Sequence, residues 1–208
     1  MRSEGVESET LRESLLYYAP VMKFNADIHH RRSTRFAGYD YAQPGWYYVT
    51  ICTDEREMLF GEVEKREMRL NEYGRIVRDS WLEIPKHYPF VTLDAFIVMP
   101  NHIHGIIVIR RNVDIHGVGV QNIEPLHTGG KEEIYHYQHT VSGSLGAIVR
   151  GFKIGVTKWF REHNVKHVVW QRNYYDHIIR NEPDYLCIRE YILNNPISWE
   201  DDELFQPK

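Results

Sequence analysis

From Phe96 to Ile109 the sequence reads FIVMPNHIHGIIVI, and this stretch decides the fold. Two apolar runs, each as long as a short buried strand, are separated by Pro100-Asn101, a pair that breaks regular structure. We therefore expect two adjacent strands, with histidines at the start of the second. Because side chains alternate along a strand, His102 and His104 should point to the same side of the sheet.

This histidine pair has two interpretations. Neutral imidazoles that converge from a rigid strand can form half of a metal site. Ordinary strand histidines on a half-exposed face have the same spacing. The pair by itself does not choose between the two.

The flanking segments carry the periodicities of a mixed α and β domain. Apolar residues recur at three- and four-residue spacing in the helical segments, and short apolar runs mark the strands. Pro85 predicts an end or a bend in the first helix, and Ser142 or Ser144 can cap the second. The expected elements are a strand over 46–52, a helix over 71–88, strands over about 91–98 and 103–110, a helix over 144–162, a strand over 168–171 and a helix over 182–193.

The order of these elements predicts an α+β fold. The first six match the split βαβ arrangement of a ferredoxin-like domain, an antiparallel sheet with two helices on one face. The last helix is an addition at the C-terminal end. A chain of 208 residues suits one such domain. We expect an N-terminal extension over 1–28, the domain over 29–200 and an acidic tail over 201–208.

Composition indicates a cytoplasmic globular protein. Hydrophobic residues make up 42% of the chain and charged residues 26%, which are ordinary values. The polar, acidic first residues lack the pattern of a signal peptide, and no apolar run approaches the length that spans a membrane. The two cysteines, Cys52 and Cys187, have no spacing typical of disulfide or zinc sites. We therefore expect a reducing location and no membrane partner.

Charge gives no general argument for a nucleic-acid partner. The net charge is −4, although acidic residues concentrate at the two ends and leave the middle of the chain near neutral. Any basic surface must therefore be local. The basic run His29–Arg35 is such a candidate, but on sequence alone a solvated loop is favoured over phosphate contact.

The last predicted helix carries Tyr191 and Asn195, four residues apart and therefore on one face. A tyrosine hydroxyl can attack phosphorus when a Lewis acid activates the phosphate, and an amide oxygen one turn away can complete a metal site. Alternatively, Tyr191 packs on the sheet and Asn195 caps the helix before Pro196. Spacing alone favours this second, structural interpretation.

Several separated motifs resemble, in order, those of single-tyrosine HUH transposases of the IS200-like type, and within them the REP-associated tyrosine transposases. The likeness covers roughly residues 29–200 and leaves out the N-terminal extension and the acidic tail. The motifs are RRSTRF at 31–36, MPNHIH at 99–104, GFK at 151–153, VWQRNYYDHIIR at 169–180 and YILNNP at 191–196.

The resemblance implies roles for individual residues. His102 and His104 would hold a divalent cation, Mg²⁺ or Mn²⁺, and Tyr191 would be the nucleophile. Asn195 stands where relatives place a third polar ligand, often glutamine, which is one methylene longer. Tyr174 and Tyr175 are rival nucleophiles by chemistry, but their motif lies outside the late helix.

The resemblance also implies an activity, namely DNA transposition by metal-dependent cleavage and rejoining of single-stranded or hairpin DNA through a 5′-phosphotyrosine. The enzyme would act as a monomer or a homodimer. We expect phosphate contacts from basic residues, with solvated surface charge as the alternative: Arg31, Arg32, Arg35, Arg150, Lys153 and Arg172. Two other functions stay open, a catalytically idle module that binds hairpin DNA or RNA and a hydrolase that uses water.

Overall fold

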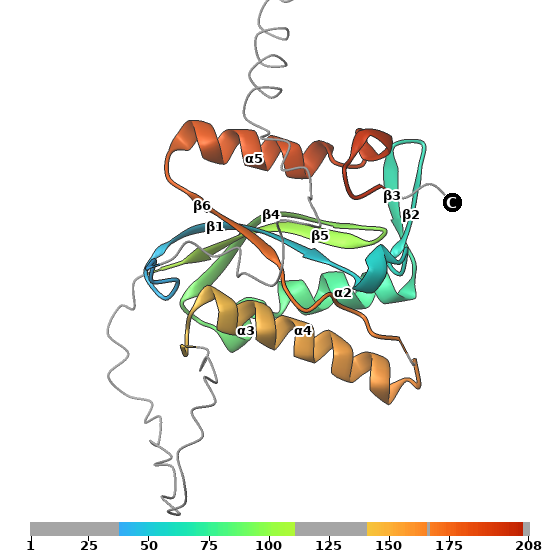
Figure 1. The fold of residues 1–208 in the computed structure, drawn as a ribbon, viewed down its shortest axis with the longest axis horizontal. Helices are drawn as coiled ribbons and strands as arrows, with labels where there is room; N and C mark the ends of the chain where they lie inside the picture. Colours follow the sequence, from blue (N-terminus) through green and yellow to red (C-terminus); the bar gives the residue numbers. More distant parts are fainter. Residues whose placement is uncertain (1–37, 111–140, 166, 206–208) are drawn as a thin grey trace, which may run out of the picture.

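A four-stranded antiparallel sheet lies at the centre of the molecule (Figure 1). The computed structural model describes residues 38–110, 141–165 and 167–205. The strands lie in the order β4-β5-β1-β6. Their bounds are Gly45–Cys52 for β1, Val91–Met99 for β4, His102–Ile109 for β5 and Tyr175–Ile179 for β6.

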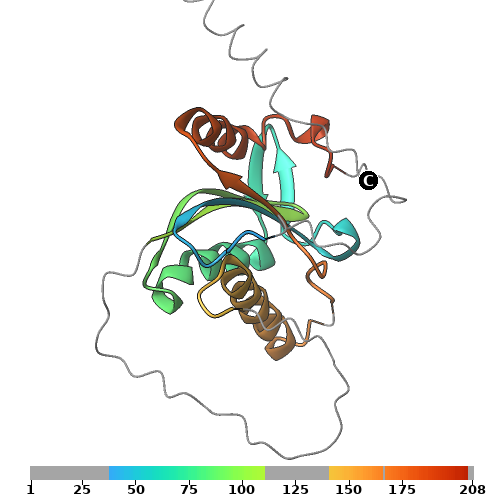
Figure 2. The same cartoon turned by 60° about the vertical axis from the view of Figure 1, so that its left-hand side comes forward.

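Helices cover both faces of this sheet. The helices α2 (Glu72–Leu82), α3 (Ile84–His87) and α4 (Leu145–Glu162) lie against one face, and α5 (Glu182–Asn194) lies against the other (Figures 1 and 2). The chain order and the strand order are those of the split βαβ arrangement. This confirms the predicted α+β, ferredoxin-like fold, in which helices pack on one face of the sheet and a further helix is added at the C-terminal end.

Local sequence explains where the helices begin. Each long helix is preceded by a residue whose side-chain oxygen accepts a hydrogen bond from a backbone N–H of the first turn, namely Asn71, Ser144 and Asn181. Pro85 lies in the first turn of α3, where its missing N–H costs no hydrogen bond. The predicted break near Pro85 is therefore real, and α2 ends before it at Leu82.

Alternation along β1 divides its side chains between two apolar cores. Tyr47, Val49 and Ile51 face α2 and α4 in the larger core. Tyr48 faces the opposite way, into a smaller core that includes Ile192 of α5. Because the histidines of β5 lie on the same side as Tyr48, α5 and the segment after it come to lie over them.

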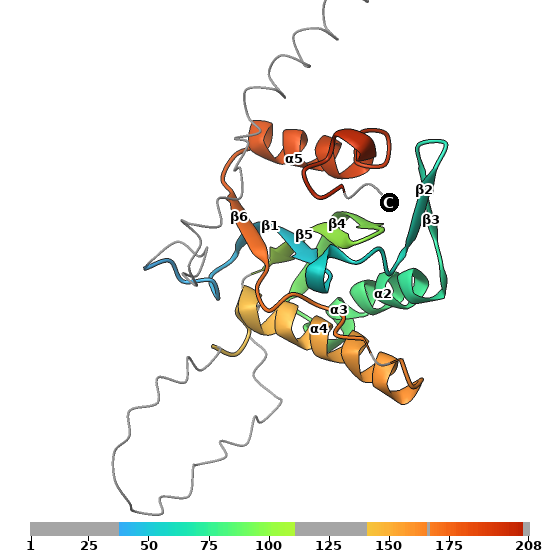
Figure 3. The same ribbon diagram turned by 45° about the vertical axis from the view of Figure 1, so that its right-hand side comes forward.

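Two sequence expectations need correction. The strand predicted over 168–171 is wrong, since only Trp170 forms a bridge there, to Thr53, and the fourth strand of the sheet is β6. Val168 is 68% exposed, whereas Val169 and Trp170 are buried, so this apolar run fills the core from an irregular segment. In addition, β2 (Gly61–Glu64) and β3 (Glu67–Leu70) form a hairpin that was not predicted, and Figure 3 shows it beside the C-terminal end of α5.

Within the ranges that the structure describes, no helix has the length and apolar character needed to cross a bilayer. Both cysteines are described, and both are free thiols.

Candidate metal centre and nucleophile

Two histidines meet at one end of the sheet, on the face that α5 covers. In the strand register His104 lies opposite Thr50 of β1, and His102 lies opposite Cys52. The two imidazoles point to the same side, as expected, with ring centroids 4.3 Å apart. Both side chains are buried. Two ligand-type nitrogens are therefore held close together on a rigid strand.

The orientation of His102 is fixed by its neighbour. Its Nδ1 lies 2.8 Å from Oδ1 of Asn101. An amide oxygen only accepts hydrogen bonds, so Nδ1 carries the proton and Nε2 keeps its lone pair. That Nε2 is buried and has no hydrogen-bond partner among the described residues. A buried nitrogen with a free lone pair is an unusual feature that a metal ion would satisfy.

The His104 ring is fixed by two hydroxyls of β1. Its Nδ1 lies 2.8 Å from Oη of Tyr48 and 2.9 Å from Oγ1 of Thr50. Because Thr50 donates its own proton to Tyr48, its contact with His104 needs a proton on Nδ1. The lone pair is then on Nε2, which lies 3.3 Å from Oη of Tyr191.

Burial keeps both imidazoles neutral. Loss of hydration lowers the pKa of His102 well below its usual value, and the nearby His104 and Arg56 lower it further. Burial also lowers the pKa of His104 to about 4, although Asp202 acts in the opposite direction. Neutral imidazoles at pH 7 are the form that binds metal ions.

A carboxylate completes the group. Asp202 follows the short helix η2 (Trp199–Asp201), and ligand atoms of Asp202, His102 and His104 all lie within 4.8 Å of one another. Its Oδ1 accepts a hydrogen bond from the backbone N–H of Leu204 at 2.7 Å. Two imidazoles and a carboxylate form a donor set that suits a divalent transition metal ion.

Asp202 was not predicted as a ligand, because it lies in the acidic stretch that the sequence places outside the domain. A run of four acidic residues after a helix has the appearance of a solvated segment. The chain instead turns back toward the sheet, and Nδ2 of Asn101, beside His102, donates to the backbone oxygen of Leu204 at 2.8 Å. This long-range contact and a hydrogen bond from Arg56 to the backbone oxygen of Glu203, at 3.2 Å, hold the tail beside the histidines.

Tyr191 and Asn195 lie one turn apart at the C-terminal end of α5, as the sequence predicted. The Tyr191 hydroxyl donates to Oδ2 of Asp202 at 3.1 Å, and Nδ2 of Asn195 donates to the same oxygen at 2.8 Å. The amide oxygen of Asn195 is buried and has no partner in the described structure. Tyr191 is 42% exposed, so one side of its ring remains open to solvent.

The local environment keeps the Tyr191 phenol protonated. Burial of the hydroxyl raises its pKa, and the negative charge of Asp202 raises it further. Attack by this oxygen therefore requires that its proton be removed during the reaction.

The rival tyrosines lie elsewhere. Tyr175 begins β6 and its ring lies 6.2 Å from that of Tyr48, while Tyr174 lines a groove beside α4. Of these three tyrosines, Tyr191 is the one whose hydroxyl lies within hydrogen-bond distance of the histidine pair.

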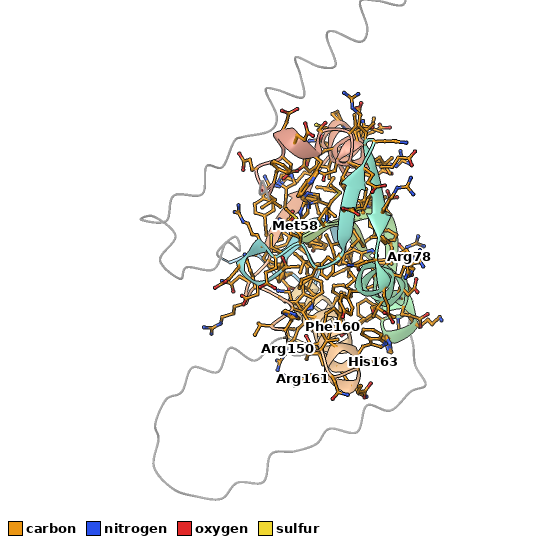
Figure 4. The ribbon with its side chains drawn as sticks, turned by 90° about the vertical axis from the view of Figure 1, so that its right-hand side faces the viewer. Met58, Arg78, Arg150, Phe160, Arg161 and His163 are labelled. Carbon is orange, nitrogen blue, oxygen red and sulfur yellow. The ribbon has the colours of Figure 1, made fainter. Side chains whose placement is uncertain are left out.

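Three of the basic residues expected to contact DNA lie in a groove away from the metal centre. Arg150, Lys153 and Arg172 line the groove between α4 and the segment 170–174. Figure 4 shows Arg150 and Arg161 extending from the same side of α4. The predicted contacts at Arg31, Arg32 and Arg35 lie outside the described residues.

Known proteins resemble this chain in sequence and in fold. No family model matches it. A Haemophilus influenzae protein of uncharacterised function is 47% identical over 183 residues, which cover 88% of this chain and 97% of the relative. A second protein from the same organism, named provisionally as a REP-associated tyrosine transposase, is 25% identical over 158 residues, or 76% of this chain and 73% of the relative.

A solved structure of a REP-associated tyrosine transposase bound to a REP hairpin has a TM-score of 0.50 and 17% identity, covering 79% of this chain and 73% of that one. The chain is thus similar in sequence to a protein named as a REP-associated tyrosine transposase, and similar in fold to a solved one. The likeness to the solved structure supports the fold, while the roles of individual residues depend on the geometry described above.

Proposed function

We propose that the protein cleaves and rejoins single-stranded DNA beside hairpin-forming repeats, with Tyr191 as the nucleophile. One observation carries the proposal: the Tyr191 hydroxyl lies 3.3 Å from Nε2 of His104 and 3.1 Å from Asp202, within a cluster of metal-type ligands. The hairpin substrate is suggested by the related structure, which was solved with a REP hairpin.

The donor set fits a divalent metal ion. His102 and His104 would bind it through Nε2 and Asp202 through a carboxylate oxygen, and the unpaired amide oxygen of Asn195 is available as a further ligand. When bound, Mg²⁺ or Mn²⁺ would polarise the scissile phosphate and stabilise the charge that develops on it. Among the ligands, the imidazoles favour Mn²⁺ over the harder Mg²⁺.

The residues around Tyr191 account for the chemical step. Its oxygen attacks the phosphorus, the new bond joins Oη to the 5′ phosphate, and the bond to the 3′ oxygen breaks. Asp202 already accepts the hydroxyl hydrogen, so it is placed to receive that proton and to pass it to the departing 3′ oxygen, which leaves as a hydroxyl. Rejoining reverses these changes with another 3′ hydroxyl, so no nucleotide cofactor is consumed.

The polar contacts of β1 orient the site. Tyr48 and Thr50 hold the His104 ring, and Asn101 holds the His102 ring, so both Nε2 atoms point to the same place. Partners of this kind fix the tautomer of a metal-binding histidine and make it a better ligand. They would act as positioning residues, without touching the DNA.

Two other proposals go with this function. We propose that the catalytic domain spans residues 29–200, with 1–28 as an extension, and that the tail over 201–208 supplies Asp202 to it. We also propose a cytoplasmic location, which the free thiols of Cys52 and Cys187 support.

A covalent adduct tests the proposed function. We would incubate the protein with Mn²⁺ and a labelled oligonucleotide that contains a hairpin and a single-stranded extension, and then denature it. Labelled protein should appear for the wild type and for Tyr175→Phe, and should be absent for Tyr191→Phe, because each substitution removes one hydroxyl and little else. An adduct that persists in Tyr191→Phe would refute the assignment. Cut DNA without any adduct would favour a hydrolase, and binding without cutting would favour an idle module.

A further inference from the structure

A groove with basic walls lies on the far side of the domain from α5. It runs between α4 and the segment 170–174, with a volume of about 710 Å³. Its charged lining consists of five basic side chains and one acidic side chain: Arg150, Lys153, Lys158, Arg161, Arg172 and Glu162. In a chain whose net charge is −4, such a concentration of positive charge is local and needs an explanation.

Three of these cations have no carboxylate partner among the residues that the structure describes. Lys158 pairs with Glu162 at 3.7 Å. Across residues 38–110, 141–165 and 167–205, no ion pair involves Arg150, Arg161 or Arg172, and all three side chains are exposed. Unpaired guanidinium groups that line a groove are suited to phosphate, which they bind through paired N–H donors.

The spacing along α4 suits an extended ligand. Arg150 and Arg161 are eleven residues apart, which is three helical turns and roughly 16 Å along the axis. Ile154 and Thr157 lie between them in the groove lining, at the four- and three-residue intervals that keep side chains on one face. A row of this length can contact several successive phosphates, and a single small anion would occupy only part of it.

Lys153 fixes the two walls relative to each other. From α4, its ammonium group donates to the backbone oxygens of Gln171 and Asn173, each at 2.8 Å. An ammonium group has three N–H donors, so one remains for a ligand in the groove. The wall that carries Arg172 is thereby held at a fixed distance from the arginines of α4.

One wall of the groove connects along the chain to the strand that lies beside the proposed metal centre. This wall, residues 171–174, leads directly into β6, whose first residue, Tyr175, lies opposite Thr50 in the sheet. Tyr175 is 38% exposed, and its ring lies 6.2 Å from that of Tyr48, which in turn lies 6.5 Å from the ring of Tyr191. β6 is the edge strand of the sheet, between the layers formed by α4 and α5 (Figure 1).

We propose that this groove binds the phosphate backbone of the single-stranded DNA that continues from the phosphate attacked by Tyr191. The strand crosses the edge of the sheet at Tyr175, where an exposed ring offers a surface for base stacking, and then follows the arginines of α4. Positive grooves combined with aromatic platforms are the usual means of binding single strands. The inference rests on the proposed function, because it assumes that DNA is the substrate of the Tyr191 site.

The test compares two triple variants in the non-cleaving Tyr191→Phe protein. The first carries Arg150→Ala, Arg161→Ala and Arg172→Ala, and the control carries Arg69→Ala, Arg75→Ala and Arg78→Ala, which removes the same charge from β3 and α2. Figure 4 shows Arg78 on the opposite side of the molecule from Arg150 and Arg161. Fluorescence anisotropy would measure the affinity for a labelled hairpin with a single-stranded extension and for the same hairpin without it, between about 50 and 200 mM salt.

The groove variant should flatten the slope of log affinity against log salt by about 2, since each single-strand phosphate contact contributes about 0.7. This change should occur only with the extended oligonucleotide, and the control triple should retain the slope of its parent. An unchanged slope, or an equal change with both oligonucleotides, would overturn the inference.

Adduct formation by the wild-type protein separates the two proposals. If the adduct on Tyr191 forms and the slope is unchanged, the groove inference fails and the proposed function stands. If the wild type neither binds nor cuts the extended hairpin, both fail.

Discussion

Replacement of Asp202 by alanine should weaken both the fold near the site and the binding of Mn²⁺. The carboxylate accepts hydrogen bonds from Tyr191, Asn195 and the backbone of Leu204. Tyr191 is partly exposed and can bond to water, but Asn195 is buried and its Nδ2 would lose its partner. An unsatisfied buried donor costs about 1–3 kcal/mol. We therefore expect a loss of about 2 kcal/mol without metal, or a melting temperature roughly 4–8 °C lower.

The stabilisation of the folded protein by Mn²⁺ gives a second, independent measure of the role of Asp202. At a concentration one hundred times its dissociation constant, an ion that binds only the folded state adds about 2.7 kcal/mol of stability. A hundredfold weaker affinity reduces this gain to about 0.4 kcal/mol at the same concentration. Thermal unfolding with and without Mn²⁺ should therefore show a large upward shift for the wild type and a small one for Asp202→Ala.

Two variants separate the hydrogen-bonding role from the metal-binding role. Asp202→Asn keeps an acceptor oxygen, so it should lose less stability than Asp202→Ala while losing most of the Mn²⁺ response. Asp201→Ala removes the neighbouring exposed acid and should behave as the wild type in both measurements. If Asp202→Ala keeps the full Mn²⁺ shift, Asp202 is not a ligand and the reasoning is refuted.

Three other predictions follow from the same geometry. His102→Ala and His104→Ala should each abolish DNA cleavage and the Mn²⁺ shift with native-like circular dichroism, and full cleavage at saturating metal would exclude a ligand role for that histidine. Gly105→Ala should cost about 1–3 kcal/mol in urea unfolding, because the new Cβ would lie 2.4 Å from the Trp81 ring; unchanged stability would contradict this packing. In metal-free protein, the pKa of His104 is about 4 in the folded state and about 6.5 in the unfolded state. Between these values unfolded chains bind more protons than folded ones. The free energy of unfolding should therefore fall as the pH drops through that window, by roughly 1 kcal/mol per pH unit for this residue. A flat profile there in acid denaturation would show that His104 is not kept neutral by burial.

The main elements could be predicted because their patterns are local. The apolar strands on either side of Pro100-Asn101 and the helical spacing of 144–162 identify both type and position, and the structure places β4, β5 and α4 there. The fourth strand was misplaced because Val169 and Trp170 pack into the core from an irregular segment and not from a strand. β6 itself is short and has the mixed burial of an edge strand, which gives a weaker pattern.

The proposed site was predictable only in part, for the same reason. His102 with His104, and Tyr191 with Asn195, are pairs whose separations of two and four residues already define a shared face. Asp202 has no such local partner. Its position depends on the turn after α5 and on the contact between Asn101 and Leu204, which links residues 103 positions apart. The basic groove likewise depends on how α4 meets the segment 170–174, although three of its residues were named individually from sequence.

Mapping of the DNA-linked peptide shows which tyrosine is the nucleophile. The wild-type protein would be trapped with a hairpin oligonucleotide and Mn²⁺, digested with protease and nuclease, and the modified peptide sequenced by mass spectrometry. We expect a nucleotide joined through its 5′ phosphate to Tyr191, in the peptide that continues to Asn195. A nucleotide on Tyr174 or Tyr175, or one joined through its 3′ phosphate, would contradict it.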